Sequence, residues 1–230
     1  GTPEYRSVKS IVLGVHYNMQ TDKMAKELWL RGQRFSADYA THWDEVDRLR
    51  RLYLKRYPGL RAYMHAREQE FLSTGRVVSA TGRVRHLGSA HMSPDTPGYG
   101  HLVNQAINFP IQSLASDITA SALMDIEREL MRQEGMDYPQ YLQLLMEMQR
   151  KFLTNPPGHD IILPIEMTFL FNEVHDSLLA DVPKSRADTD RALIIDTMRA
   201  IPSLRKLCPG FDCPLDIDVR CGPTWGLKKE

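Results

Sequence analysis

Residues 165–182 read IEMTFLFNEVHDSLLADV and decide the fold class of this chain. Apolar, β-prone residues fill Ile165–Val174 and Leu178–Val182, and His175-Asp176-Ser177 separates the two runs. Two such runs around a short polar segment predict a tight antiparallel β-hairpin. Its tip would hold the Asp176 carboxylate on rigid neighbours, as a metal ligand for phosphoryl chemistry is held. Aspartate is also a common turn residue, so the local pattern alone leaves both interpretations open.

Helical patterns precede and follow this hairpin, because apolar residues recur there at helical intervals. Pro58-Gly59 separates two of these segments. Pro110 lies at or near the start of another, where its missing amide costs least. The predicted helices are Arg6–Leu30, Ala37–Tyr57, Leu60–Phe71, Gln112–Met131, Tyr138–Phe152 and Ser185–Ala200.

The remaining segments alternate like strands or lack a period. Gly75–Ala80 and Arg83–Leu87 flank Thr81-Gly82 and predict a second β-hairpin. Ser93–Gly100 has the composition of a loop, and Leu215–Val219 that of a last strand. Helices therefore come first and a mixed half second. This order predicts an α+β fold, with a helical part followed by an antiparallel β-hairpin and its flanking helices.

Composition excludes several classes of protein. The 230 residues are 42% apolar and 25% charged, which is typical of a globular chain and not of a disordered one. No apolar run approaches the ~20 residues of a membrane span, and no secretory pattern opens the sequence, so we expect a cytoplasmic protein. Cys208, Cys213 and Cys221 lack paired zinc-site spacing, and we expect reduced, inert thiols. Basic and acidic residues number 29 each, so any basic surface for nucleic acid must be local.

Three motifs follow one another along the chain. They are RSVKSIVLGVHY at 6–17, AINFPIQ at 106–112 followed by Ser116-Asp117-Ile118, and Val174-His175-Asp176 followed by Ser177-Leu178. In this order, and with Arg56–Tyr63 and Thr81-Gly82-Arg83 between them, they resemble the fingers helix, the palm helix and the C motif of family A DNA polymerases, the DNA polymerase I type. The resemblance implies a fingers subdomain over residues 1–102 and the C-terminal half of a palm subdomain over residues 103–230.

The first motif places a cation and an aromatic ring on one side of a helix. Lys9, Leu13 and Tyr17 are four residues apart and would share a face that can meet a triphosphate. The resemblance implies that Lys9 neutralises the phosphates and protonates the leaving pyrophosphate, that Leu13 packs on the sugar, and that Tyr17 stacks near the templating base. The family also has an arginine at the position of Tyr5, so two alternatives stay open: the neighbouring Arg6 takes over its triphosphate contact, or the contact is lost. Without the other motifs, the spacing would indicate an amphipathic helix with a buried tyrosine and a surface lysine.

The second and third motifs carry amides, an imidazole and a carboxylate. Amide side chains both donate and accept hydrogen bonds, so Asn108 and Gln112 could contact the minor-groove edge of any base pair without reading sequence. The resemblance implies this duplex contact, a contact of His175 with the primer end, and Asp176 as a Mg²⁺ ligand in a two-metal site. The alternative for Asn108 is a helix cap.

The hairpin around Thr81-Gly82 carries three arginines, Arg76, Arg83 and Arg85. Arg83 is a candidate contact to DNA phosphates, as part of this group. A solvated hairpin face is the alternative.

Five positions depart from the family pattern. Tyr5 stands where an arginine normally precedes the lysine by four residues, and Leu13 replaces an aromatic residue, which hints at a viral or otherwise divergent relative. Asn18 replaces a common glycine. Asn104 replaces an arginine, which removes a contact to template or primer. Ser177 replaces a glutamate that is helpful in the family but not central, so we do not interpret its loss as inactivation.

The resemblance also implies a residue that we do not find in this sequence. The first catalytic aspartate of the family lies in an Asp-Tyr-Ser-like strand motif upstream of the fingers helix, and Asp38-Tyr39 follows that helix in a charged stretch, so it does not qualify. We therefore expect these 230 residues alone not to polymerise. The expected partners are primer-template DNA, dNTPs, Mg²⁺, and a second polypeptide or N-terminal half that carries the thumb and that aspartate, in a bacterial cytoplasm or a phage-infected host. Two alternatives stay open: a non-catalytic duplex-binding or regulatory remnant, and an unrelated helical α+β protein with no salt-sensitive DNA binding.

Overall fold

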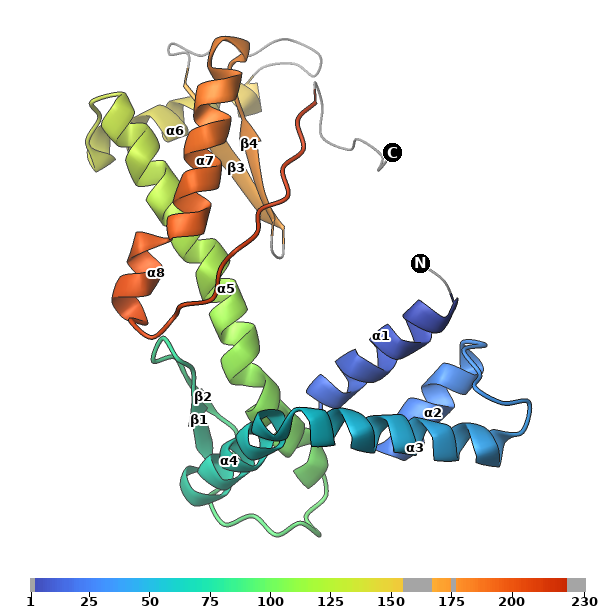
Figure 1. The fold of residues 1–230 in the computed structure, drawn as a ribbon. Helices are drawn as coiled ribbons and strands as arrows, with labels where there is room; N and C mark the ends of the chain where they lie inside the picture. Colours follow the sequence, from blue (N-terminus) through green and yellow to red (C-terminus); the bar gives the residue numbers. More distant parts are fainter. Residues whose placement is uncertain (1–2, 155–166, 175–176, 223–230) are drawn as a thin grey trace. The chain divides into compact units, whose positions relative to one another are not determined.

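The computed structural model describes residues 3–154, 167–174 and 177–222, which form a mostly helical chain with two small antiparallel sheets (Figure 1). The chain divides into two compact units, Gly1–Leu114 and Ala115–Glu230. The division falls inside α5 (Tyr99–Gln133). The predicted α+β class is confirmed, whereas the subdomain boundary after residue 102 stays a prediction.

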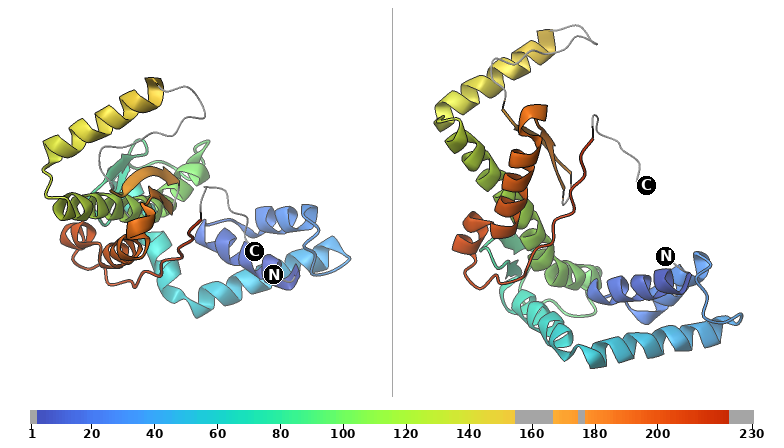
Figure 2. Two further views of the ribbon diagram at one scale, coloured as in Figure 1. Left: turned by 90° about the horizontal axis from the view of Figure 1, so that it is seen from above. Right: turned by 45° about the horizontal axis from the view of Figure 1, so that its top comes forward.

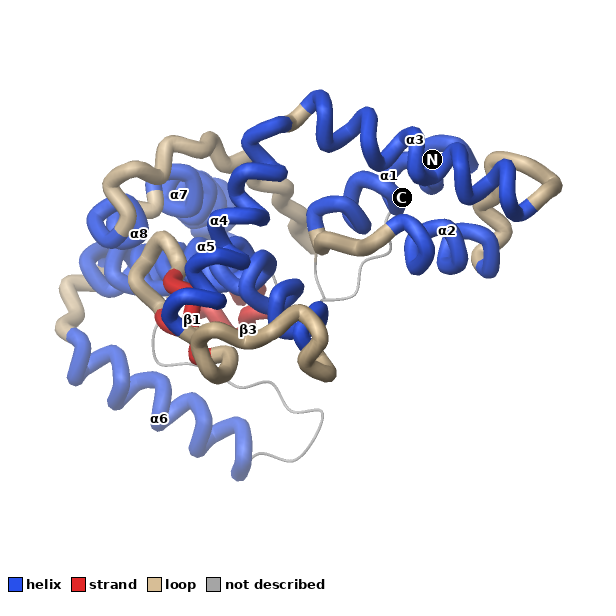
Figure 3. The backbone as a smooth tube through the Cα atoms, turned by 90° about the horizontal axis from the view of Figure 1, so that it is seen from below, coloured by secondary structure: helices blue, strands red, loops and turns tan. Residues whose placement is uncertain are grey.

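Three helices build the first core of the N-terminal unit. They are α1 (Pro3–His16), α2 (Thr21–Leu30) and α3 (Tyr39–Arg56), and Figure 3 shows them grouped together. The α3 helix begins after Asp38, whose carboxylate accepts a hydrogen bond from the Thr41 amide at 2.8 Å, as an N-cap does. A Cβ on Gly14 would lie 2.8 Å from Met24 Cε, so glycine allows α1 and α2 to approach closely. The buried residues of this core are Ile11, Val15, Met24, Ala25, Leu28 and Val46.

A second core joins α4 (Pro58–Thr74) to a hairpin and to the first part of α5. The hairpin pairs β1 (Arg76–Val78) with β2 (Val84–His86), as the sequence predicted. Pro58 opens α4, where its missing amide costs nothing, and Gly75 ends α4 in the left-handed region at φ 71°. The buried residues here are Met64, Phe71, Val77, Leu87, Val103, Ala106 and Ile107.

The C-terminal unit packs a hairpin against helices. Its elements after α5 are α6 (Tyr138–Thr154), β3 (Phe169–Val174), β4 (Ser177–Asp181), the 3₁₀ turn η1 (Lys184–Arg186), α7 (Ala187–Ala200) and α8 (Pro202–Leu207). The views of Figure 2 show the β3–β4 hairpin lying alongside α7. One apolar cluster holds the unit together, and it includes Ile126, Leu130, Tyr141, Leu144, Met167 and Phe169, with Leu193 and Ile194 of α7 packed against them.

Two buried carboxylates fix the helices of this unit. Asp190 of α7 is 1% exposed, and it accepts a hydrogen bond from Thr168 Oγ1 at 2.5 Å and an ion pair from Arg186 Nε at 3.1 Å. Asp125 of α5 accepts the Ser203 amide at 3.0 Å in the first turn of α8. A buried carboxylate is costly unless it accepts hydrogen bonds or pairs with a cation. Both contacts therefore fix the elements that they join in one arrangement.

Three sequence-based expectations are wrong in detail. The helix predicted over Arg6–Leu30 is two helices, with a turn over residues 17–20. The palm helix begins at Tyr99 and not near Gln112, so Pro110 lies inside it. Residues 215–219 are not a strand, because no described strand pairs with them.

Two further expectations concern the environment of the chain. Among the described residues, no helix combines the length and the apolar character needed to cross a bilayer. Cys208, Cys213 and Cys221 are all free thiols.

Candidate functional site

The first candidate surface is the outer face of α1. Leu13 is 47% exposed and Tyr17 is 49% exposed, and Lys9 and Arg6 are exposed beside them. On the opposite side, Ile11 and Val15 are buried in the first core. The alternative of a helix with a buried tyrosine is therefore wrong, and the cation and the aromatic ring predicted from the spacing face outward together.

The α1 helix ends in a turn that explains one departure from the family pattern. Asn18 has φ 53°, and its amide donates to the Val15 carbonyl at 2.9 Å. The Met19 amide donates to the Gly14 carbonyl at 2.8 Å. These two bonds form a Schellman motif, which places one residue in the left-handed region, where glycine is the usual choice and asparagine the next. Asparagine at position 18 therefore keeps the turn.

The same asparagine joins α1 to the amide-bearing part of α5. Asn18 Nδ2 donates to Asn104 Oδ1 at 2.9 Å, across 86 residues of sequence. One turn further along α5, Asn108 Nδ2 donates to the Asn104 carbonyl at 2.8 Å. Gln112 follows after another turn and is exposed. Asn108 is thus an interior residue of α5, and the alternative that it caps the helix is wrong.

The arginines of the β1–β2 hairpin differ in their surroundings. Arg85 donates to Gln105 Oε1 at 3.2 Å, and its guanidinium lies 5.7 Å from the centre of the Phe109 ring, so it is tied to α5. Arg76 and Arg83 are exposed, and the Arg83 amide is fixed by Ser79 Oγ at 3.0 Å. Sequence reasoning grouped all three arginines, whereas the structure ties Arg85 to α5.

The predicted catalytic residues His175 and Asp176 lie outside the described residues. The last pair of the β3–β4 ladder is Val174 with Ser177, which confirms the hairpin that the sequence predicted between these two strands. No group of three or more His, Cys, Asp or Glu side chains within the described ranges could hold a metal ion. The metal role of Asp176 therefore stays a prediction.

Sequence reasoning also missed a surface at the junction of α3 and α4. The Tyr53 and Tyr57 rings pack there at a tilt of 48° with their centres 4.7 Å apart, and His16 Nε2 is joined to the Tyr53 hydroxyl at 2.8 Å. Burial and the neighbouring Tyr57 hydroxyl raise the pKa of Tyr53, so its phenol stays protonated at neutral pH. The signal in the sequence was a pair of tyrosines four residues apart, LYLKRY at 52–57, among basic residues.

Comparison with known proteins gives the family. The sequence model of the family described as DNA polymerase family A matches residues 2–227. The chain therefore belongs to DNA polymerase family A. In this family member, the turn after α1 is hydrogen-bonded to the amide-bearing helix α5.

Individual relatives cover almost the whole chain. It is 24% identical to the thermostable DNA polymerase I of Thermus filiformis, over 98% of this chain and 21% of that protein. It is also 24% identical to DNA polymerase theta of Drosophila melanogaster, over 97% of this chain and 9% of that protein. The chain therefore spans about a fifth or less of the length of these curated relatives.

A solved structure shares the fold. The POL domain of Pol1 from M. smegmatis, in complex with DNA primer-template and dNTP, matches with a TM-score of 0.60 and 19% identity, over 85% of this chain and 27% of that chain. At this identity the likeness shows the fold alone.

Proposed function

We propose that this chain is the part of a DNA-directed DNA polymerase that binds the nucleotide and the duplex. The polymerase transfers a nucleotide from a dNTP to a primer 3′-hydroxyl. The observation that carries the proposal is the Asn18–Asn104 bond at 2.9 Å, because it joins the helix that exposes Lys9, Leu13 and Tyr17 to the helix of Asn108 and Gln112. These are the residues that the family resemblance assigns to the nucleotide and the duplex.

Each side chain has a role that suits its chemistry. Lys9 and Arg6 neutralise the triphosphate, and Lys9 gives a proton to the pyrophosphate oxygen as the bond to the α-phosphorus breaks. Leu13 contacts the sugar, and Tyr17 offers a flat ring to the templating base. Both side chains are close to half exposed, so a ligand can reach them without a rearrangement of the core.

The duplex is held by neutral groups on α5. Asn108 and Gln112 contact the minor-groove edge of the new base pair and its sugar, where amides meet acceptors common to all sequences. His175 contacts the primer end, and Arg83 contacts a phosphate. Asn108 Nδ2 donates one of its two hydrogens to the Asn104 carbonyl, so the second hydrogen remains to donate to a minor-groove acceptor.

Family A polymerases use divalent metal ions, and we propose Asp176 as the ligand that this chain contributes to Mg²⁺. The bound ion would polarise the phosphate and lower the pKa of the primer hydroxyl. Because the resemblance assigns a second catalytic aspartate to a motif that we do not find here, we propose that a partner polypeptide or an N-terminal half supplies it.

Reconstitution tests this proposal. The 230 residues alone should give no primer extension, and addition of a polypeptide with the thumb and the Asp-Tyr-Ser-like motif should restore Mg²⁺-dependent extension. Asp176→Ala should abolish it, and Lys9→Ala should lower the rate about a hundred-fold or more, as loss of a general acid does. Lys23→Ala on α2 is the matched control, since Lys23 is also an exposed lysine. A reconstituted pair that binds duplex but never extends a primer would instead support the non-catalytic remnant.

A further inference from the structure

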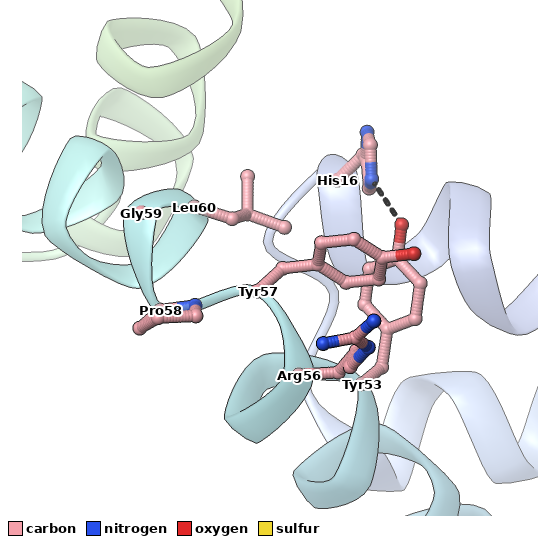
Figure 4. A pocket seen from close by; sticks show the side chains of 7 residues that line it. All are labelled: His16, Tyr53, Arg56, Tyr57, Pro58, Gly59 and Leu60. Atoms are coloured by element: carbon pink, nitrogen blue, oxygen red, sulfur yellow. Dashed lines mark hydrogen bonds between the residues drawn. The ribbon is translucent and has the colours of Figure 1, made fainter.

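The α3–α4 junction and the end of α1 enclose an open pocket of about 480 Å³ (Figure 4). Its lining includes His16 from α1, Tyr53 and Arg56 from the last turns of α3, and Tyr57 and Leu60 from the junction with α4. His16 is the last residue of α1, the helix that exposes Lys9 and Leu13.

Aromatic rings dominate the pocket, and the backbone fixes their positions. Tyr57 is 51% exposed, and its ring lies tilted against the Tyr53 ring at 48°, so about half of the Tyr57 side chain is open to a ligand. Its amide donates to the Tyr53 carbonyl at 3.0 Å, and its carbonyl accepts the Leu60 amide at 3.1 Å. Tyr53 is held in turn by the 2.8 Å hydrogen bond to His16, visible as a dashed line in Figure 4. An exposed ring on a rigid backbone can stack on a ligand, and little conformational entropy of the side chain is lost when the ligand binds.

The charge around the pocket is one-sided, although the whole chain is neutral. Residues 48–67 contain seven lysines and arginines and no aspartate or glutamate. Arg48, Arg51 and Arg67 pair with carboxylates outside this segment. Within the part of the chain that the structure describes, no carboxylate pairs with Lys55, Arg56 or Arg61.

An exposed aromatic ring beside cations without a carboxylate partner fits one chemistry. An unpaired nucleobase offers a flat π-face, and its phosphodiester offers the negative charge that the basic segment lacks. A buried apolar partner would not need the cations, and a double-stranded phosphate backbone would not need the rings. We infer that this pocket binds an unpaired base of single-stranded DNA, with the base stacked on Tyr57 and the adjacent phosphate on Arg56.

This inference rests on the proposed function, because a polymerase substrate carries a single-stranded template beyond the duplex. The occupant is then a base of the template 5′ overhang that has not yet been copied. Stacking tolerates every base, so the site would hold the template without a sequence preference.

Fluorescence anisotropy without dNTP or metal tests the inference with three DNA probes. They are a blunt duplex, the same duplex with a short oligothymidine 5′ overhang, and that overhang made abasic. The thymidine overhang should bind more tightly than the other two probes. Tyr57→Ala should weaken binding of that probe alone, by about five-fold to a hundred-fold, the value of one stacked base. Tyr57→Phe should bind like the parent chain.

Two further variants make the outcome specific. Tyr57→Leu fills similar space without a ring and should bind as weakly as Tyr57→Ala. Tyr138→Ala removes a tyrosine on α6 that is 60% exposed, and it should change nothing. Arg56→Ala should reduce the slope of log binding constant against log salt by about one on the overhang probes.

Equal binding of the thymidine and blunt probes, or equal effects of Tyr57→Ala and Tyr138→Ala, would overturn the inference and leave the proposed function standing. Failure to bind any of the three probes would overturn both. Unchanged blunt-duplex binding by the Tyr57 variants also shows that they are folded.

Discussion

Replacing Asp190 with alanine should release the β3–β4 hairpin from α7. Asp190 is 1% exposed, and its carboxylate receives Thr168 Oγ1 at 2.5 Å and Arg186 Nε at 3.1 Å. Thr168 itself is fully buried and immediately precedes β3. The substitution would therefore leave a buried hydroxyl without an acceptor and a partly buried guanidinium without one of its carboxylates.

The size of the effect follows from these contacts. Removing one partner of a buried ion pair costs about 3–5 kcal/mol. Arg186 retains Glu134, with which it also forms an ion pair, so we expect the lower end, about 3 kcal/mol, for Asp190→Ala. That is about a hundred-fold in the unfolding equilibrium. Asp190→Asn keeps an acceptor for Thr168 and should cost about half as much.

Hydrogen exchange locates the effect. Exchange of the amides of residues 169–181 should accelerate in Asp190→Ala, whereas exchange in α3 of the other unit should not change. Asp188→Ala is the matched control, because Asp188 is an exposed aspartate in the first turn of the same helix. In the reconstituted polymerase, Asp190→Ala should also lower extension, since Asp176 follows β3. The reasoning is refuted if Asp188→Ala and Asp190→Ala cost the same, or if exchange rises equally in α3.

Two further predictions concern a polar contact and a titratable group. Asn18→Gly keeps the left-handed turn but loses the side-chain amide, so Asn18→Gly and Asn104→Ala should each lower the free energy of unfolding by about 1 kcal/mol. A double-mutant cycle measured by urea unfolding should show a coupling energy of about the same size. Additive effects of the two substitutions would contradict the hydrogen bond. Burial raises the pKa of Glu127 more than the hydrogen bond from Tyr141 lowers it. The stability that Glu127 contributes is therefore present below its unfolded pKa and is lost as pH rises through its folded pKa. From pH 4 to pH 7, Glu127→Gln should accordingly gain stability relative to the parent chain. Urea midpoints of the two chains that shift in parallel between these pH values would contradict this.

The elements that the sequence predicted well are those with a local signal. The Thr81-Gly82 hairpin, the Pro58 junction and the two apolar runs of β3 and β4 each follow from turn chemistry and side-chain period. The break after α1 has no glycine or proline in the four turn residues, and it depends on Asn18 adopting φ 53°. That conformation closes the Schellman motif at the end of α1, and asparagine is a weaker signal for it than glycine, so the sequence alone does not predict the break.

Pro110 and residues 215–219 were misjudged for a different reason. Both positions follow good local rules, since proline favours the first turn of a helix and alternating apolar residues favour a strand. In the structure, α5 continues through Pro110, whose neighbours Ala106 and Ile107 are buried in the second core. The segment 215–219 has no described partner strand. Tertiary packing decided the first case, and the absence of a neighbour in the described sheets decided the second.

The pairing of Asn18 with Asn104 changes how two departures from the family pattern are understood. In the sequence each looked like a separate loss, of a flexible glycine and of an arginine directed at DNA. The structure joins the two side chains at 2.9 Å, so Asn104 contacts the turn that follows α1. Under the proposed function, the positive charge that meets DNA therefore has to come from other residues. We propose that Lys55, Arg56 and Arg61, which pair with no carboxylate among the described residues, are that local basic surface beside Tyr53 and Tyr57.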